Sequence, residues 1–134
     1  MNLFQKYDPD EYSPLILAYI GDAVFDLYFR MKVISSEKFQ TRFAHKKVVS
    51  IVNGKRQASF LKKMLPLLTE QELDIVRRAR NKKITSHPKG VAMADYRHAT
   101  SLEALLGYYF LLKDEENLKR LFQMMETILV QDET

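Results

Sequence analysis

The sequence predicts an all-α protein, because its apolar residues recur at helical spacing and no segment shows a sustained strand-like alternation. Capping residues and prolines divide the apolar segments into separate helices. The chain has 134 residues, of which 46% are hydrophobic and 28% are charged. Those proportions are typical of a globular domain large enough to bury its own core. We therefore expect residues 1–134 to form one all-helical domain.

The first strong element is a helix from Pro14 to about Val33. Ser13 can cap it, and Pro14 fits the first helical position, where its missing N–H costs nothing. Apolar residues surround this helix almost completely. A helix of this kind is usually buried, so we expect it to be a central helix and not a surface helix.

A second helical segment covers 41–64, with Gly54 as a point of interruption and Pro66 beyond its end. Thr69 and Glu72 form a capping-box pattern, which predicts that a third helix begins there and continues to about Arg80.

The remaining chain reads as a loop followed by two helices. Residues 81–90 (NKKITSHPKG) contain proline, glycine and short polar residues, which predict a loop. A fourth helix begins between Met93 and Thr100 and ends at Leu112, and a fifth covers 114–131.

The charge is segregated along the chain. The net charge is +4 and the pI about 9.2, yet residues 38–69 and 75–94 contain no acid at all. Acids gather instead at 8–11 and from Asp114 onward. This segregation predicts a positive face suited to a polyanion such as nucleic acid, although a solvated basic surface on a protein with another function would look the same.

Asp22 is an acid in an apolar helix. Burying a lone carboxylate is costly, so Asp22 needs a hydrogen-bond donor, a cation or a metal ion as its partner. Asp26 lies one turn further on the same stripe, and Gly21 would let another backbone or a substrate approach closely. An arginine or a backbone amide holding Asp22 remains an open alternative.

Glu103 occupies a second very apolar helix, with Gly107 four residues later. If that helix begins at Thr100, Glu103 completes a capping box and has only a structural role. If the helix begins earlier, near Asp95, Glu103 is an interior acid that needs a partner. Two carboxylates meeting across a helix contact are a suitable site for Mg²⁺, which takes one or two carboxylates plus waters and phosphate.

Other chemistries find little support in the residues. Cysteine is absent, which excludes disulfides and suits a reducing cytoplasm. His45, His87 and His98 lack the spacing of zinc ligands, and phosphate-loop and nucleophile-elbow patterns are missing. The most apolar segment, 15–29, is interrupted by acids, so we expect no membrane span.

Two motifs resemble the ribonuclease III family. Residues 19–26 (YIGDAVFD) resemble its signature helix, and 102–107 (LEALLG) resemble its second acidic motif, with 51–53 (IVN) between them also similar. The chain is closer still to the short Mini-ribonuclease III subfamily, through the segments 17–23, 45–47, 80–82 and 96–97.

The resemblance spans about 13–121, which we take as the core of a single ribonuclease III-type helical domain. It leaves no residues for the separate double-stranded-RNA-binding domain of longer members. Ala18 and Thr100 stand where the longer members have a glutamate and an aspartate. The Mini-ribonuclease III pattern shares both losses and is still taken to be an active nuclease.

The resemblance implies a metal-dependent endoribonuclease that cleaves double-stranded RNA. Asp22 and Glu103 would be its catalytic residues and its ligands for Mg²⁺, with Mn²⁺ as a substitute and Asp26 as a further candidate ligand. It also implies a cytoplasmic homodimer with Ala18 and Tyr19 as interface candidates, maturation of precursor 23S ribosomal RNA, and a ribosomal protein as a candidate cofactor.

We expect the RNA contacts to come from the basic segments and the loop between the third and fourth helices. Shape recognition of an A-form duplex needs such phosphate contacts and little base reading. The candidate residues are Lys46, Lys47, Arg78, Arg80, Asn81, Lys82, Lys83 and Lys89.

Two other functions remain open at the level of sequence. One is a catalytically inactive RNA-binding or ribosome-assembly protein with the same fold, which the loss of two carboxylates at Ala18 and Thr100 favours. The other is a helical dimerisation module whose basic face meets an acidic protein. Mg²⁺-dependent cleavage separates the first from the enzyme, and preference for duplex RNA separates the second.

Overall fold

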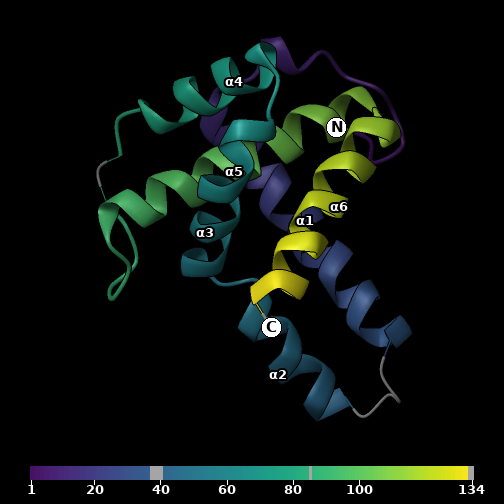
Figure 1. Cartoon of the computed structure of the whole chain (residues 1–134). Coiled ribbons are helices and arrows are strands. Elements are labelled where there is room, and N and C mark those ends of the chain that lie inside the picture. The colour runs from purple at the N-terminus through teal and green to yellow at the C-terminus, as the bar shows by residue number, and fades with distance from the viewer. Residues whose placement is uncertain (37–40, 85, 133–134) are drawn as a thin grey trace.

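A computed structural model describes residues 1–36, 41–84 and 86–132 of the chain (Figure 1). These residues form helices and contain no β-strand, so the all-α prediction is confirmed. The elements in chain order are η1 (Pro9–Glu11), α1 (Pro14–Ser36), α2 (Thr41–Ile51), α3 (Gly54–Met64), η2 (Leu65–Leu67), α4 (Glu70–Arg80), α5 (Met93–Leu112) and α6 (Glu115–Asp132).

Local capping interactions set several of the helix starts. The predicted capping box is confirmed: the Glu72 N–H donates to Thr69 Oγ1 at 3.2 Å, and the Thr69 N–H donates to Glu72 Oε1 at 2.9 Å. The predicted segment 41–64 is two helices, because the Asn53 side chain accepts from the Arg56 N–H at 2.9 Å and starts α3. Gly54 is therefore the first residue of α3.

α5 is the central helix, with α1, α3 and α4 packed around it (Figure 1). Nearly every residue from Ala99 to Leu111 is buried. The prediction that α1 is a central helix and not a surface helix is wrong for one side of α1. α1 packs on α5 along one side, while apolar residues on its other side, such as Tyr19 and Leu27, are 82% and 59% exposed. The apolar pattern of a helix predicts that it will be covered, but it does not tell which of its sides the other helices of the chain will cover.

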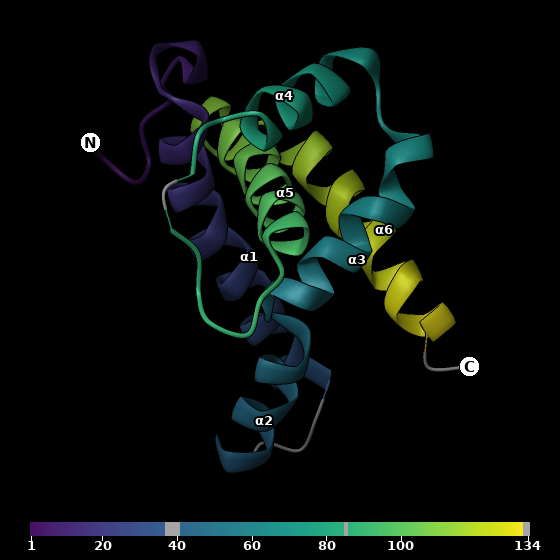
Figure 2. The ribbon, with the colours of Figure 1, turned by 90° about the vertical axis from the view of Figure 1, so that its left-hand side faces the viewer.

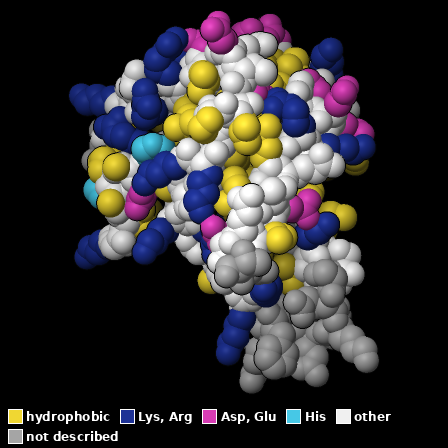
Figure 3. Space-filling model, viewed as in Figure 1, with side chains coloured by type: hydrophobic (Ala, Val, Ile, Leu, Met, Phe, Trp, Pro, Cys, Tyr) yellow, Lys and Arg dark blue, Asp and Glu magenta, His cyan; other side chains and the backbone are white. Residues whose placement is uncertain are grey.

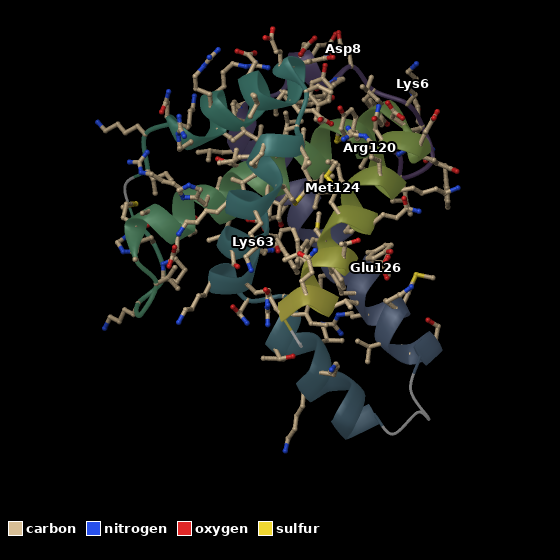
Figure 4. The ribbon with its side chains drawn as sticks, in the orientation of Figure 1. Lys6, Asp8, Lys63, Arg120, Met124 and Glu126 are labelled. Carbon is tan, nitrogen blue, oxygen red and sulfur yellow. The ribbon has the colours of Figure 1, made fainter. Side chains whose placement is uncertain are left out.

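A fully buried carboxylate joins α4, α5 and α6. Glu72 accepts hydrogen bonds from Tyr109 Oη at 2.6 Å and from the Arg120 guanidinium. Burial alone would raise the pKa of Glu72, but these donors and the Thr69 amide hold that pKa below its ordinary value. Figure 4 labels Arg120 on α6, from which its side chain reaches this cluster. Removing one partner would leave the charge buried and unpaired, so the cluster fixes the packing of three helices.

α6 closes the domain by packing on α1 and α3. Tyr28 of α1 stacks on Phe122 with ring centroids 3.8 Å apart and donates a hydrogen bond to Glu126 at 2.7 Å. Lys63 of α3 pairs with Asp132 at 2.5 Å, and Figure 4 shows Lys63 and Glu126 on these neighbouring helices. The C-terminal helix therefore belongs to the same packed unit as the rest of the chain.

The crossing of α1 and α5 is a contact between two backbones. A Cβ added to Gly21 would lie 1.7 Å from the Glu103 carbonyl oxygen, and one added to Gly107 would lie 1.9 Å from the Leu17 carbonyl oxygen. No other residue fits at either position without moving a helix, because real Cβ atoms do not approach other atoms so closely. The group that approaches Gly21 closely, as predicted, is thus the backbone of α5.

Gly107→Ala should lower the free energy of unfolding by at least 1–3 kcal/mol, the cost of overpacking a close-packed contact. Chemical denaturation followed by circular dichroism would measure it. Gly54→Ala is the matched control, since its added Cβ would meet only Val91 Cγ1, at 3.9 Å, and it should be neutral or slightly stabilising. Equal stability of the two variants would contradict the backbone contact.

Candidate active site

Asp22 and Glu103 meet where α1 crosses α5. Gly21 contacts the carbonyl group of Glu103. Asp22 is the next residue along α1, and its carboxyl lies within hydrogen-bonding reach of the Glu103 carboxyl. α5 begins at Met93, so Glu103 is an interior residue and the capping-box alternative is wrong. The Thr100 hydroxyl donates instead to the Tyr96 carbonyl at 2.8 Å. The structure therefore brings together the two acids that the sequence analysis singled out.

The environment of Glu103 disfavours a negative charge. Burial raises the pKa of its carboxyl, and the hydrogen bond and negative charge of Asp22 raise it further, to about 9; Gln57 acts weakly in the opposite direction. Within the part of the chain that the structure describes, no cation pairs with Asp22, so the alternative of an arginine partner is not supported. A cation placed between the two carboxyls would favour the ionised form of both.

The site opens into a groove along α1. The groove has a volume of about 630 Å³, and Asp22 and Asp26 supply its acids among mostly apolar neighbours. Asp22 is exposed, while Glu103 is partly buried. One carboxylate therefore faces a polar molecule arriving from solvent, and the other anchors the site to the core.

Asp26 has a partner of its own. Its carboxylate accepts from Arg30 at 2.8 Å, one turn further along α1. Across residues 1–36, 41–84 and 86–132, no three acids or histidines form a group that could hold a metal ion. Asp22 and Glu103 nevertheless fit an ion such as Mg²⁺, because that ion is commonly held by one or two carboxylates with water and phosphate completing its shell.

Gln57 of α3 is a neighbour of Glu103 that sequence reasoning missed. It is only 4% exposed, and its Nε2 has no hydrogen-bond partner of normal geometry in the described structure, although the amide lies near the Glu103 carboxyl. A signal was present in the sequence: Gln57 interrupts an apolar stripe that continues through Phe60, Leu61 and Met64.

A basic surface covers the C-terminal end of α4 and the following loop. Figure 2 shows this loop leaving α4 and returning to the start of α5, and Figure 3 shows Lys and Arg side chains gathered on that side of the molecule. Asn81, Lys82, Lys83 and Lys89 are exposed there. Arg78 is also exposed but pairs with Asp74 at 3.1 Å.

The two remaining groups of predicted RNA contacts are placed differently. The Arg80 side chain is half-buried, and its carbonyl accepts a hydrogen bond from Arg97 of α5 at 2.7 Å, which anchors the start of the loop. Lys46 and Lys47 are exposed on α2, which projects from another end of the molecule (Figure 1). The side chain of His45 lies outside the described residues.

The two interface candidates have opposite environments. Ala18 is 6% exposed and belongs to the core of the chain, so its side chain cannot form much of an interface. Tyr19 is 82% exposed and lines the groove beside Asp22.

Among the described helices, none is both long and apolar enough to cross a membrane.

Comparison with known proteins shows to which family the fold and the two acidic motifs belong. The family model of the ribonuclease III domain matches residues 15–114, which include α1, α5 and both acids of the site. The chain belongs to the ribonuclease III family. Proteins named Mini-ribonuclease 3 are similar over most of the chain, so its place is in this short branch of the family.

The Mini-ribonuclease 3 of Thermoanaerobacter sp. strain X514 is 45% identical over 117 residues, covering 87% of this chain and 82% of that protein. The protein of the same name from Clostridium tetani is 35% identical over 123 residues, or 91% and 82% of the two chains. A Fusobacterium nucleatum crystal structure superposes with a TM-score of 0.81 at 31% identity, over 92% of this chain and 94% of that one. The protein is thus an endoribonuclease of the ribonuclease III type.

The metal-free protein should lose stability as the pH rises from about 5 to 9. The folded state holds a proton on Glu103 up to a pKa of about 9, whereas the unfolded state releases it near 4.5. This contribution is complete below the lower value and disappears as the pH passes the upper one, with a slope on the order of 1 kcal/mol per pH unit. Urea unfolding in EDTA at a series of pH values would measure the slope.

Glu103→Gln should remove that slope, and Asp22→Asn should confine it to a narrower range of pH above 4.5, because burial of Glu103 still raises its pKa without the negative charge of Asp22. An unchanged slope in Glu103→Gln would show that another group causes the pH dependence.

Proposed function

We propose that this ribonuclease III-type enzyme cleaves double-stranded RNA with the help of a divalent cation, Mg²⁺ or Mn²⁺, held by Asp22 and Glu103. The observation that carries the proposal is the meeting of these two acids at the backbone contact of α1 and α5. Ordinary core packing does not require two carboxyls to face one another, because each raises the cost of charging the other.

A bound divalent cation would supply an activated water and would stabilise charge on the departing oxygen of a phosphodiester. The chain's own contribution is to hold two oxygen ligands on rigid helices rather than on loops. Asp22 faces the groove, where a phosphate can approach, and Glu103 is fixed by the surrounding core. Asp26 lines the same groove, and because it already pairs with Arg30 we assign it a secondary role, as an outer-shell or second ligand.

We further propose that the enzyme is a homodimer formed through the exposed face of α1. That face carries Tyr19, Leu27 and Met31, which are 82%, 59% and 63% exposed. Large contiguous apolar patches of this kind are rare on monomers and mark interaction sites. Pairing two copies here would cover the apolar side of α1 and would bring the two copies of Asp22 onto a shared groove, as cutting both strands of a duplex requires.

The basic loop supports binding of the RNA duplex. Lys82, Lys83 and Lys89 are exposed beside the N-terminal end of α5, the helix that carries Glu103. Phosphate contacts of this kind position a duplex without reading its sequence. Arg97 of α5 donates a hydrogen bond to the Arg80 carbonyl at the start of the loop, so the loop has a fixed position relative to α5. A duplex bound by the loop would therefore have a fixed position relative to Glu103 on the same helix.

We propose precursor 23S ribosomal RNA as the natural substrate, with a ribosomal protein as a candidate cofactor, in the cytoplasm. The support is the similarity to Mini-ribonuclease 3 proteins over most of the chain. The packing of α6 on α1 and α3 supports a single catalytic domain that extends beyond the matched residues 15–114.

Glu103→Gln should abolish Mg²⁺-dependent cleavage of a long RNA duplex while leaving duplex binding intact, because a cation ligand is lost without a change of shape. Gel electrophoresis for cleavage and a filter-binding assay for affinity are the measurements. Glu116→Gln, an exposed acid on α6, is the control and should cleave at the native rate. If the native protein binds duplex and cuts nothing, the chain is an inactive RNA-binding relative.

Lys82→Ala combined with Lys83→Ala should weaken duplex binding and flatten its dependence on salt, by about one unit of slope for each phosphate that the protein no longer neutralises. Lys6→Ala combined with Lys119→Ala removes the same charge from exposed sites elsewhere and should leave the slope unchanged. Equal salt slopes in the two double variants would remove the loop from the RNA interface.

Leu27→Glu should convert a dimer into a monomer of 15.7 kDa, because it places a charge in the apolar interface. Sedimentation equilibrium would measure the mass. Val130→Glu, on α6 and also exposed at 63%, is the control and should remain dimeric. A Leu27→Glu protein that stays dimeric would place the interface elsewhere.

A further inference from the structure

Gln57 is a buried amide on an otherwise apolar face. Phe60, Leu61 and Met64 on the same stripe of α3 are fully buried, and Gln57 itself is 4% exposed. Its Nε2 makes no hydrogen bond of normal geometry in the described structure, although the amide is near enough to the Glu103 carboxyl to act on it as a donor and lower its pKa. An unsatisfied buried donor costs about 1–3 kcal/mol, and an apolar side chain of the same length would avoid that cost. The amide therefore needs an explanation beyond packing.

The position of Gln57 relative to the two acids supplies one. α3 packs against α5, and the Gln57 amide lies near the Glu103 carboxyl, while Asp22 reaches the same carboxyl from α1. Glu103 is thus placed between an interior amide on one side and, on the other, an acid that faces the groove. Contact between Gln57 and an RNA duplex is excluded by its burial.

We propose that Gln57 is a positioning residue for Glu103: its Nε2–H donates to one oxygen of the Glu103 carboxylate and turns the other toward Asp22 and the cation. This inference rests on the proposed role of Asp22 and Glu103 as cation ligands. A carboxylate that binds a cation through one oxygen keeps free lone pairs on the other, and such ligands are oriented by hydrogen-bond donors behind them. The amide already lies near the Glu103 carboxyl, and a cation that ionises this carboxyl would strengthen the hydrogen bond between them.

The test is Gln57→Met, which nearly keeps the shape of the side chain and removes the donor. Binding of Mn²⁺ alone, without RNA, would be followed by calorimetry and by electron paramagnetic resonance. We expect the affinity to fall at least about 10-fold, the usual effect of losing a partner of a metal ligand. The stability of the protein in EDTA should stay the same or rise, because an unsatisfied buried group has been removed.

A purely structural role predicts the opposite pair of results, a less stable protein in EDTA with unchanged Mn²⁺ affinity, and would overturn the inference. Met64→Leu, on the same stripe of α3, is the matched control for altered packing and should keep the native affinity.

Asp22→Asn separates the inference from the proposed function. If the native protein binds Mn²⁺ no more tightly than Asp22→Asn, the cation site fails and the role of Gln57 fails with it. If the native protein binds more tightly than Asp22→Asn, while Gln57→Met binds as well as the native protein, only the inference about Gln57 is wrong.

Discussion

The contact between the backbones of α1 and α5 at Gly21 and Gly107 is the constraint on which the site depends. Each glycine leaves room for a carbonyl oxygen of the opposite helix, at positions where a Cβ would lie within 2 Å of it. Helices normally pack 8–10 Å apart because side chains separate them, and the absence of two side chains brings these two closer. Asp22 follows Gly21 on α1, and Glu103 is the residue of α5 whose carbonyl group meets Gly21, so the two acids are brought together.

Two glutamates, Glu72 and Glu103, show how the fold assigns different tasks to one residue type. Glu72 is surrounded by donors from Tyr109, Arg120 and the Thr69 amide, so its pKa is held low and its charge joins three helices. Glu103 faces a second acid and only one nearby donor, the Gln57 amide, and its pKa is raised to about 9. The first environment is complete within the chain, whereas the proposed cation would complete the second, and a strongly shifted pKa of this kind is typical of functional sites.

The same incompleteness appears on the surface. α1 is apolar on all sides, yet α5 covers only one of them, and the groove beside Asp22 is lined mostly by apolar side chains. The basic loop is exposed on the side of the α5 N-terminus, and the acids gather elsewhere (Figure 3). A cation, a second chain and an RNA duplex would each satisfy one of these features. The function proposed for this member of the ribonuclease III family would account for all three.

The sequence by itself determined the helices with local start signals, the two acidic motifs and the segregation of charge. The capping box at Thr69 and the close approach at Gly21 depend on few residues and were predictable. α5 begins after Ala92 without a side-chain cap, so no local pattern could tell whether Glu103 is an interior residue. The tertiary structure decided that Glu103 is an interior residue of α5 and that α5 is the central helix. It also decided the pairing of Asp26 with Arg30 and the position of Gln57. All four depend on which helix faces meet, and no local sequence pattern records that.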